Sequence, residues 1–416
     1  MRPPRLAAIA LLLAGLALGA CDVAPGATPT PATDLVLPTG TLEPAVPLVS
    51  VDLQVPEVNR LGNYAQPHTL NVPPGFQVGV FAAGLQHPRM LALSPDGEVY
   101  ATIRAEGRIV RLPDANKDGI ADEVVTFADG IVSVHGIAFR DKQVYAASER
   151  ELLRLEDTDG DGKADKREVL ADDLPYPGVH STRTIRFGPD GKLYLAAGSS
   201  CNACVEEDER RAAISIYSVD GVFERVYAKG IRNAVGFTFH PDTGDLWATN
   251  NSRDGAGEDI PPENMYRVKD GGDYGWPFCY GIRETDPTME GPEGYCATID
   301  LPEFFLPPHY APLGLTFYTG DMFPEDYSGD MIFAAHGSWD REIRTGYKLV
   351  RVHFKDGQPD KSLGDKMVED FVIGWLTDEV KGDHWGRPVD VLVGPDGSLY
   401  VTDDAGMGIY RITYSR

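Results

Sequence analysis

Six segments of the chain share one order of apolar and polar positions. Each begins with polar residues, continues with a strand of alternating apolar residues, a turn of the Pro-Asp-Gly type and a second alternating strand, and adds a third strand that ends in a basic residue. They span residues 87–112, 135–155, 180–199, 232–268, 312–352 and 387–414. An Asp-Gly turn between two strands of period two is typical of a β-hairpin.

The spacing of these segments predicts the fold. Their starts lie roughly 45 to 50 residues apart early in the chain and 75 to 80 apart late, close to one four-stranded propeller blade with insertions. A solenoid would repeat more tightly, and a β-sandwich would not repeat one motif so often. No comparable stretch has a long period of 3.6 residues, so helices should be minor. The pattern therefore predicts an all-β, six-bladed β-propeller.

Equivalent positions of a propeller's repeats should gather around its central channel, because the innermost strand of every blade lines that channel. The starts of the repeats contribute Arg89, His135, His180, Arg183, Arg232, Asn233, His309 and Arg387. The ends of the second strands contribute Arg104, Ser199, Asn250, Asn251, His336, Asp403 and Asp404. A single one of these residues is as well explained by a hydrogen bond or ion pair between blades. Together they predict a pocket for an anionic, polar ligand.

Charge and the N-terminal segment bear on location. The net charge of −25 argues against nucleic acid as a partner. A positive start, an apolar run over residues 6–18 and Leu18-Gly-Ala-Cys21 predict a lipoprotein signal over residues 1–21, with lipidation at Cys21. An ordinary signal with a chance Cys is the alternative, and the apolar run is shorter than the ~20 residues that span a bilayer. We expect an exported protein at the outer face of the cytoplasmic membrane, attached by the lipid alone.

The rest of the chain divides into a linker and a body. Residues 22–51 are rich in Pro and Thr and predict an extended linker, and residues 52–416 form the propeller. Four cysteines remain in the body, Cys201, Cys204, Cys279 and Cys296. An even number in an oxidising compartment favours disulfides. A zinc site at the Cys-x-x-Cys pair is the alternative, although no His pair follows it.

Two acidic stretches fit the pattern of a calcium loop. Asp157, Asp159, Asp161 and Asp165 alternate around Gly162, and Glu168 stands at the twelfth position. Alternating carboxylates, a Gly at the turn and a closing acid are the ligand pattern of such loops. The second stretch, residues 114–125, has Val125 in place of the closing acid. We expect structural calcium loops; an acidic surface turn is the alternative.

Three strings carry a resemblance to a known family: residues 180–194, which begin His180-Ser-Thr-Arg, then Gly230-Ile-Arg-Asn233, and Gly271-Gly-Asp-Tyr-Gly-Trp-Pro277. They resemble the soluble glucose dehydrogenase and sorbosone dehydrogenase family, six-bladed propellers that use pyrroloquinoline quinone (PQQ). The resemblance extends from about Pro73 to Tyr414. Residues 198–204, 250–263, 311–314 and 336–339 are more similar to the sorbosone-dehydrogenase branch. Val179 and Ser199 stand where the glucose enzymes carry sugar-contacting acids, so glucose is a doubtful substrate.

The resemblance implies roles for individual residues. His180 matches the general base, and Arg232 the arginine that polarises the quinone carbonyl. Arg387, Arg341 (or Arg344), His135, His336 and Asn233 would hold the cofactor, whose carboxylates suit guanidinium groups. Asn250, Asn251 and Asp254 would supply ligands to a calcium ion at the quinone.

The implied function is oxidation of a sugar or sugar-derived aldehyde by an exported enzyme that uses PQQ and calcium. Electrons would pass to an external acceptor such as a cytochrome or a quinone. The first alternative is a propeller without redox chemistry that binds a glycan or a protein partner at its channel mouth. A calcium-dependent lactonase is a weaker alternative, because it would need acidic and Asn ligands around the channel instead of Arg and His.

Overall fold

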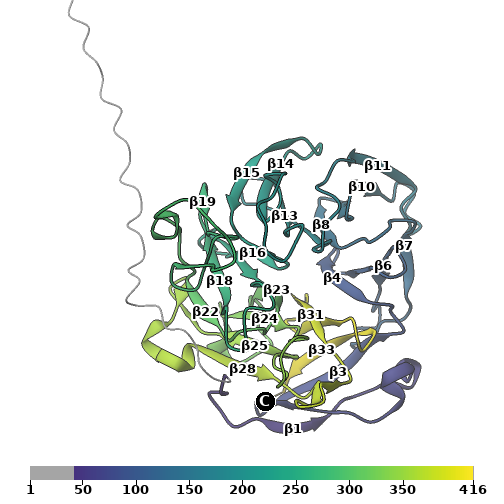
Figure 1. The fold of residues 1–416 in the computed structure, drawn as a ribbon. Helices are drawn as coiled ribbons and strands as arrows, with labels where there is room; N and C mark the ends of the chain where they lie inside the picture. Colours follow the sequence, from purple (N-terminus) through teal and green to yellow (C-terminus); the bar gives the residue numbers. More distant parts are fainter. Residues whose placement is uncertain (1–41, 416) are drawn as a thin grey trace, which may run out of the picture.

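The computed structural model describes residues 42–415 of the chain and shows a ring of antiparallel sheets around a central channel (Figure 1). Five sheets have four strands, and the sixth has a short fifth strand added to its outer edge. The predicted six-bladed β-propeller is confirmed. Strand alternation and Asp-Gly turns place one hairpin after another, and each hairpin buries its faces against the neighbouring blades.

The first three blades follow one another along the chain. Blade 1 contains β4 (Pro88–Leu93), β5 (Val99–Ile103), β6 (Arg108–Leu112) and β7 (Val125–Ala128). Blade 2 contains β8 (Gly136–Arg140), β9 (Gln143–Ala147), β10 (Leu152–Glu156) and β11 (Lys166–Ala171). Blade 3 contains β12 (Arg183–Phe187), β13 (Leu193–Ala197), β14 (Ala213–Tyr217) and β15 (Phe223–Lys229), with β19 (Gly272–Asp273) added in parallel.

The other three blades carry the longer insertions. Blade 4 contains β16 (Phe237–Phe239), β17 (Leu246–Asn250), β18 (Glu263–Val268) and β22 (Phe304–Leu306). Blade 5 contains β23 (Pro312–Phe317), β24 (Met331–Ala335), β25 (Lys348–Val352) and β28 (Val368–Val372). Blade 6 contains β31 (Pro388–Val393), β32 (Leu399–Asp403), β33 (Gly408–Tyr414) and β3 (Phe76–Ala83). Three two-stranded hairpins lie in the insertions: β20 (Cys279–Tyr280) with β21 (Glu284–Thr285), β26 (Phe354–Lys355) with β27 (Gln358–Pro359), and β29 (Leu376–Asp378) with β30 (Asp383–His384).

Strand β3, which precedes blade 1 in the chain, closes the ring. It is the outermost strand of blade 6 and pairs antiparallel with β33, so an early strand and the last strand of the body lie in one sheet. The innermost strands β4, β8, β12, β16, β23 and β31 each contact the next around the channel. The sequence pattern did not identify β3, because no Pro-Asp-Gly turn joins it to its neighbours in the blade.

Buried threonines tie each inner strand to the next blade. The Oγ1 of Thr102 donates to the carbonyl of His135 at 2.8 Å, that of Thr402 to Arg89 at 2.7 Å, and that of Thr249 to Leu313 at 3.0 Å. The packed apolar clusters also join neighbouring blades, since one cluster contains residues of β14 and β16 and another residues of β3 and β4. These contacts fix the backbone at the channel mouth.

The folded body begins slightly before the predicted boundary at residue 52. β1 (Val49–Asp52) pairs with β2 (Thr69–Val72), so the last residues of the predicted linker form a strand. Val49-Ser-Val-Asp52 alternates in polarity as a strand does, and this short signal was hidden by the Pro-rich stretch before it. The rest of the predicted linker, up to residue 41, and the signal segment lie outside the described residues.

Helices are minor in the described part, as predicted. The short 3-10 helices span Glu57–Asn59, Gly62–Ala65, Tyr295–Ala297, Glu325–Tyr327 and Lys361–Met367. Within residues 42–415 no helix has the length and apolar character needed to cross a membrane. Two disulfides join Cys201 to Cys204 and Cys279 to Cys296. Because all four body cysteines are in disulfides, a zinc site at Cys201 and Cys204 is excluded in this structure.

Candidate functional site

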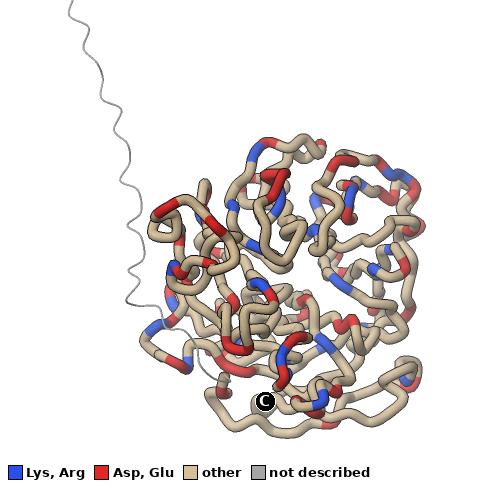
Figure 2. Tube along the Cα trace, viewed as in Figure 1, with Lys and Arg blue, Asp and Glu red and all other residues tan. Residues whose placement is uncertain are grey.

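A continuous row of polar residues, here called the channel-mouth belt, joins the blades at one end of the channel. The belt consists of Arg387, His336, Asp404, Arg89, Arg104, Ser181, His180, Ser199 and Arg232. These residues precede or begin the inner strands or end the second strands, positions that lie at the same end of every blade. Figure 2 shows basic segments at the inner ends of several blades, among acidic segments spread over the body.

One half of the belt is a chain of charged groups. The Nε of Arg387 donates to the carbonyl of His336 at 3.1 Å, and the Nε2 of His336 lies 3.0 Å from the Oδ1 of Asp404. The Oδ2 of Asp404 accepts from the Nη1 of Arg89 at 2.5 Å. Burial lowers the pKa of His336 to about 4 in spite of the Asp404 carboxylate. Although burial alone would raise it, the pKa of Asp404 is lowered by His336 and Arg89.

The other half of the belt contains the predicted base. The Nη2 of Arg104 donates to the Oγ of Ser181 at 2.7 Å, and Ser181 directly follows His180. The Nδ1 of His180 lies 3.0 Å from the carbonyl oxygen of Ser199 and 2.9 Å from its Oγ. Ser199 in turn donates its backbone N–H to the carbonyl of Arg232 at 2.8 Å. The belt therefore joins His180 to the neighbourhood of Arg232.

These contacts fix the tautomer of His180. A carbonyl oxygen only accepts, so the Nδ1 of His180 carries the proton and the Nε2 presents its lone pair. The Oγ of Ser199 donates to the carbonyl of Cys201 at 2.7 Å and can therefore accept from the imidazole. Burial and the charge of Arg232 lower the pKa of His180 to about 3. A neutral imidazole with a free Nε2 can accept a proton from a ligand.

Arg232 is held differently from the expectation. Its side chain is 3% exposed, and its Nε donates to the carbonyl of Asn202 at 3.0 Å. The Nη1 donates to the carbonyls of Asn251 at 3.1 Å and Ser252 at 2.9 Å. The Nη2 donates to the Oδ1 of Asn202 at 2.8 Å and the Oδ2 of Asp254 at 3.0 Å. All five N–H groups of a guanidinium are thus used within the protein.

The three predicted ligands of the cofactor calcium carry hydrogen bonds within the protein. The carbonyl of Asn251 and the carboxylate of Asp254 accept hydrogen bonds from Arg232, and the Oδ1 of Asn250 accepts the backbone N–H of Asn233 at 3.0 Å. Asp254 also lies with His309 and Asp340 in a group whose ligand atoms are within 4.8 Å of one another, so calcium at this place stays a prediction. Arg232 occupies two of the three predicted groups in this structure. Sequence spacing could not show this, because the cation comes from the loop before β16.

Asn233 lies beside His180 in a cradle that depends on a glycine. A Cβ at Gly198 would come within 2.3 Å of the Oδ1 of Asn233 and within 2.6 Å of the Cβ of His180. The Oδ1 of Asn233 is buried and has no hydrogen-bond partner within residues 42–415. An unpaired buried acceptor is costly, so this position suits a ligand that offers an N–H.

Two predicted cofactor residues lie apart from the belt. His135 has 0% exposure, and its buried Nε2 has no partner in the described chain. It lies beneath the belt, where burial and the charges of Arg89 and Arg104 lower its pKa. Arg341 contacts Glu258 at 3.8 Å and Asp259 at 3.5 Å. The side chain of His135 has no exposed surface in this structure, and its part in holding the cofactor stays a prediction.

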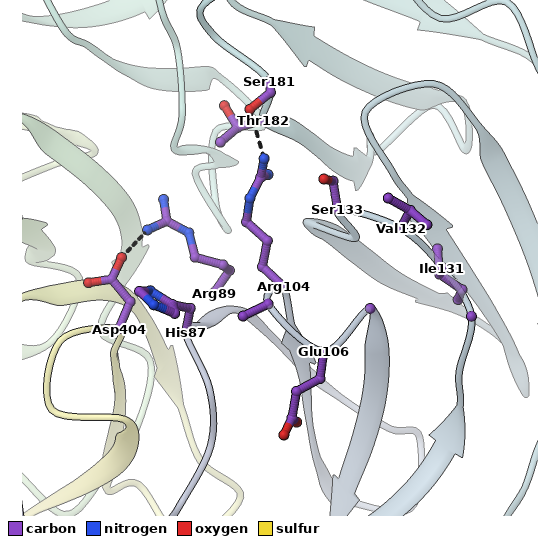
Figure 3. A pocket seen from close by; sticks show the side chains of 13 residues that line it. His87, Arg89, Arg104, Glu106, Ile131, Val132, Ser133, Ser181, Thr182 and Asp404 are labelled. Atoms are coloured by element: carbon purple, nitrogen blue, oxygen red, sulfur yellow. Dashed lines mark hydrogen bonds and ion pairs between the residues drawn. The ribbon is translucent and has the colours of Figure 1, made fainter.

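A cavity of about 690 Å³ opens beside the belt (Figure 3). This volume is in the range of small-molecule sites. Arg89 and Arg104 extend side by side into it, and Ser133 and Val132 lie on the opposite side. Ser181, the neighbour of His180, also lines it. The cavity is therefore cationic on one wall and adjoins the base.

Comparisons with known proteins identify the family of the chain. A family model described as TrAA12-like matches residues 70–415. The chain belongs to the TrAA12-like family. A pyrroloquinoline quinone-dependent pyranose dehydrogenase of Coprinopsis cinerea is 27% identical over 406 residues, which cover 83% of this chain and 54% of that protein. The chain thus spans about half the length of this relative. The aldose sugar dehydrogenase YliI of Escherichia coli K12 is 26% identical over 387 residues, covering 83% of this chain and 93% of that protein.

A solved structure supports the fold of the TrAA12-like chain. The holo form of the pyranose dehydrogenase PQQ domain from Coprinopsis cinerea superposes with a TM-score of 0.71 at 23% identity, covering 87% of this chain and 98% of that one. Relatives of the chain therefore include PQQ-dependent sugar dehydrogenases, and the broader resemblance drawn from the sequence is confirmed.

The predicted structural calcium loop is partly assembled in this family member. Carboxylate oxygens of Asp157, Asp159 and Asp161 lie within 4.8 Å of one another. Asp165 is close by and accepts from the backbone of Thr158 at 3.1 Å. Glu168, expected as the closing ligand of the loop, lies on β11 and pairs with Arg154 at 2.7 Å. The register of β10 and β11 places it opposite that arginine. Whether the loop binds calcium stays a prediction, as does the second stretch.

Sequence reasoning left several residues of the site without a role. Asn202 holds Arg232 from inside the Cys201–Cys204 loop, and its only signal was the Cys-x-x-Cys spacing. Glu263, with a pKa raised to about 8 by burial, accepts the backbone N–H of Ser252 at 2.6 Å and supports the loop around Arg232. Arg104 was placed in the ring of basic groups without a function.

Proposed function

We propose that this chain oxidises a sugar or a sugar-derived aldehyde, with PQQ as hydride acceptor and His180 as general base. The observation that carries the proposal is the hydrogen bond from His180 Nδ1 to the carbonyl of Ser199, which leaves Nε2 free to accept a proton beside a cationic cavity. Membership of the TrAA12-like family and the two sugar dehydrogenase relatives support the substrate class.

The residues at the channel mouth fit PQQ. The Nη1 of Arg387 has no hydrogen-bond partner within residues 42–415, so it is available to a carboxylate. Arg89 follows along the belt, joined to Arg387 through His336 and Asp404. The unpaired Oδ1 of Asn233 suits the pyrrole N–H of the cofactor. When bound, PQQ would accept a hydride, and with it two electrons, from the substrate carbon. His336 positions Arg387 through its carbonyl oxygen.

Each protein group then has a stated part. His180 removes the proton from the substrate hydroxyl at Nε2, and the Ser199 carbonyl holds its imidazole in that orientation. Arg232 contributes charge instead of a free hydrogen bond, because its N–H groups are used by the loop around Asn251. A buried positive charge favours negative charge that develops nearby. No step of this proposal passes through calcium, because the predicted ligand oxygens are occupied.

The finer features belong to the same proposal. The strings shared with the sorbosone-dehydrogenase branch favour a substrate other than glucose, such as an aldehyde or another aldose. The lipoprotein signal that ends at Cys21 supports export and a lipid anchor at the outer face of the cytoplasmic membrane. An extracytoplasmic enzyme passes its electrons to an external acceptor, for which a cytochrome or a quinone is the expected class.

Reconstitution tests the proposal. Purified chain is loaded with PQQ, with and without calcium, and reduction of an artificial dye is followed over a panel of aldoses and aldehydes. We expect turnover with the wild-type protein and a loss of about two orders of magnitude or more in His180→Ala, with PQQ binding retained. Equal turnover in the variant would remove His180 from its role. A chain that binds no PQQ would be the glycan- or partner-binding propeller instead.

A further inference from the structure

Arg104 is a partly buried cation that forms no ion pair with the residues described. Its Nη2 donates to the neutral hydroxyl of Ser181, and its Nη1 is buried and has no hydrogen-bond partner within residues 42–415. Burial and the neighbouring charge of Arg89 lower its pKa. An unpaired buried donor on a charged group is costly unless a ligand completes it. Arg104 therefore has a donor that none of the described residues uses.

The other charges of the cavity already have partners. Arg89 pairs with Asp404 at 2.5 Å, and Glu106 pairs with Arg108 at 2.6 Å. Among the residues described, no carboxylate lies within ion-pair distance of Arg104. Arg104 is therefore the one arginine of the cavity lining that no described carboxylate pairs with directly, although the charge of Glu149 acts on it from beyond ion-pair distance. This unpaired arginine contrasts with the net charge of −25 of the whole chain.

The position of Arg104 connects this charge to the reaction site. Its guanidinium donates to Ser181, the residue directly after His180. Adjacent Cα atoms lie ~3.8 Å apart, so the charge of Arg104 lies near His180. Figure 3 shows Arg104 reaching toward Ser181 and Thr182, with Ser133 and Val132 across the cavity. Val132 is 81% exposed and offers an apolar surface to the carbon face of a sugar ring. Arg387 is separated from Arg104 along the belt by His336, Asp404 and Arg89.

We propose that Arg104 determines specificity for a sugar that carries an anionic group, a carboxylate as in a hexuronate or a phosphate ester. The inference rests on the proposed function and names its substrate class. Guanidinium groups bind both anions through paired, charge-assisted hydrogen bonds. A neutral sugar leaves the Nη1 of Arg104 unpaired, and sites with an unpaired buried group reject such ligands strongly.

Substrate pairs that differ in one group test the proposal. Glucose is compared with glucuronate and with glucose 6-phosphate in the PQQ-loaded enzyme, as kcat/KM. We expect at least one anionic sugar to be preferred, and the preferred one identifies the group. In Arg104→Gln, the ratio of kcat/KM for that sugar to kcat/KM for glucose should fall roughly 10- to 100-fold, the effect of losing a charge-assisted hydrogen bond.

Two controls distinguish a role of Arg104 in substrate specificity from a general effect of removing an arginine and from a role in cofactor binding. Arg225→Gln removes an exposed arginine of blade 3 that pairs with Asp270. It should leave the ratio of kcat/KM for the anionic sugar to kcat/KM for glucose unchanged. PQQ affinity should be unchanged in Arg104→Gln, because a fall there would make Arg104 a cofactor ligand. If glucose and the anionic sugars are used equally, or if Arg104→Gln lowers all of them alike, the proposal is wrong.

Direct binding decides the inference even if no sugar is oxidised. Calorimetric titration of the chain with glucuronate and with glucose 6-phosphate, at low and moderate salt, needs no turnover. We expect one of them to bind the wild-type chain and Arg225→Gln, and to bind Arg104→Gln at least roughly ten-fold more weakly. Absence of dye reduction together with such binding would reject the oxidation and retain the anion site. Absence of binding by both anionic sugars would reject the site.

Discussion

His180 should make the stability of the protein depend on pH in a way that a single substitution removes. Burial and the charge of Arg232 lower its pKa to about 3 in the folded chain, whereas the ordinary value is about 6.5. Below about pH 6.5 the unfolded chain therefore binds a proton at this site that the folded chain does not. Stability is unaffected by His180 above that pH and is lost as the pH falls.

The size of the effect follows from the two pKa values. At about pH 5, some 1.5 units below the ordinary value, the lost free energy of unfolding is about 2 kcal/mol. Glutamine cannot take up this proton, so the loss between about pH 7.5 and about pH 5 should be smaller in His180→Gln by about 2 kcal/mol. Other titrating groups cancel in the difference between the two proteins.

Urea denaturation of wild-type protein and His180→Gln at the two pH values measures this difference. The same proteins, loaded with PQQ, give the pH profile of turnover, and the wild-type rate should show no loss from protonation of His180 down to about pH 5. Equal losses of stability in the two proteins would refute the reasoning, because His180 would then titrate near its ordinary pKa and would be largely charged at acidic pH.

Three further outcomes follow from other sites. Gly198→Ala should lower turnover at least roughly ten-fold with the fold retained, because its Cβ meets Asn233 and His180, while Gly79→Ala, with ordinary contacts at 3.7 Å, should be neutral in the same assay. Hydrogen bonds to Asp330 and Glu369 outweigh burial and raise the pKa of His353 to about 9. The protonated side chain therefore stabilises the fold fully below about pH 6.5, and this stabilisation is lost as the pH rises through about 9. Urea titrations at pH 7 and above should show a smaller loss of the free energy of unfolding in His353→Gln than in the wild-type protein. Calcium should raise the melting temperature of the wild-type protein and not of Asp161→Asn, and equal behaviour of the two would leave an acidic turn without an ion.

The repeating part of the fold was predictable from the sequence. Turns such as Pro95-Asp-Gly97 fix the register of each hairpin locally, and each repeat, whatever the length of its insertion, becomes one blade around the axis. The same argument placed His180, Arg232 and Arg387 at one end of the channel. The outer strands were harder to identify, because β3 pairs with β33 across almost the whole length of the body.

Pairing between side chains was not predictable in the same way. Position in a repeat brings Arg232 to the channel, yet its partner oxygens belong to two different loops, at Asn202 and Asn251. Glu168 satisfies a spacing rule but follows the register of its strand toward Arg154. Arg89 pairs with a carboxylate and Arg104 does not. This difference depends on contacts between distant segments, which cannot be read from one sequence.

Titration of the purified chain with PQQ, followed by protein fluorescence, tests the central claim most directly. The account predicts saturable binding of one PQQ per chain, weakened at least roughly ten-fold in Arg387→Gln through loss of a charge-assisted contact and nearly unchanged in His180→Ala. Absence of saturable binding, or binding that is indifferent to Arg387, would contradict it.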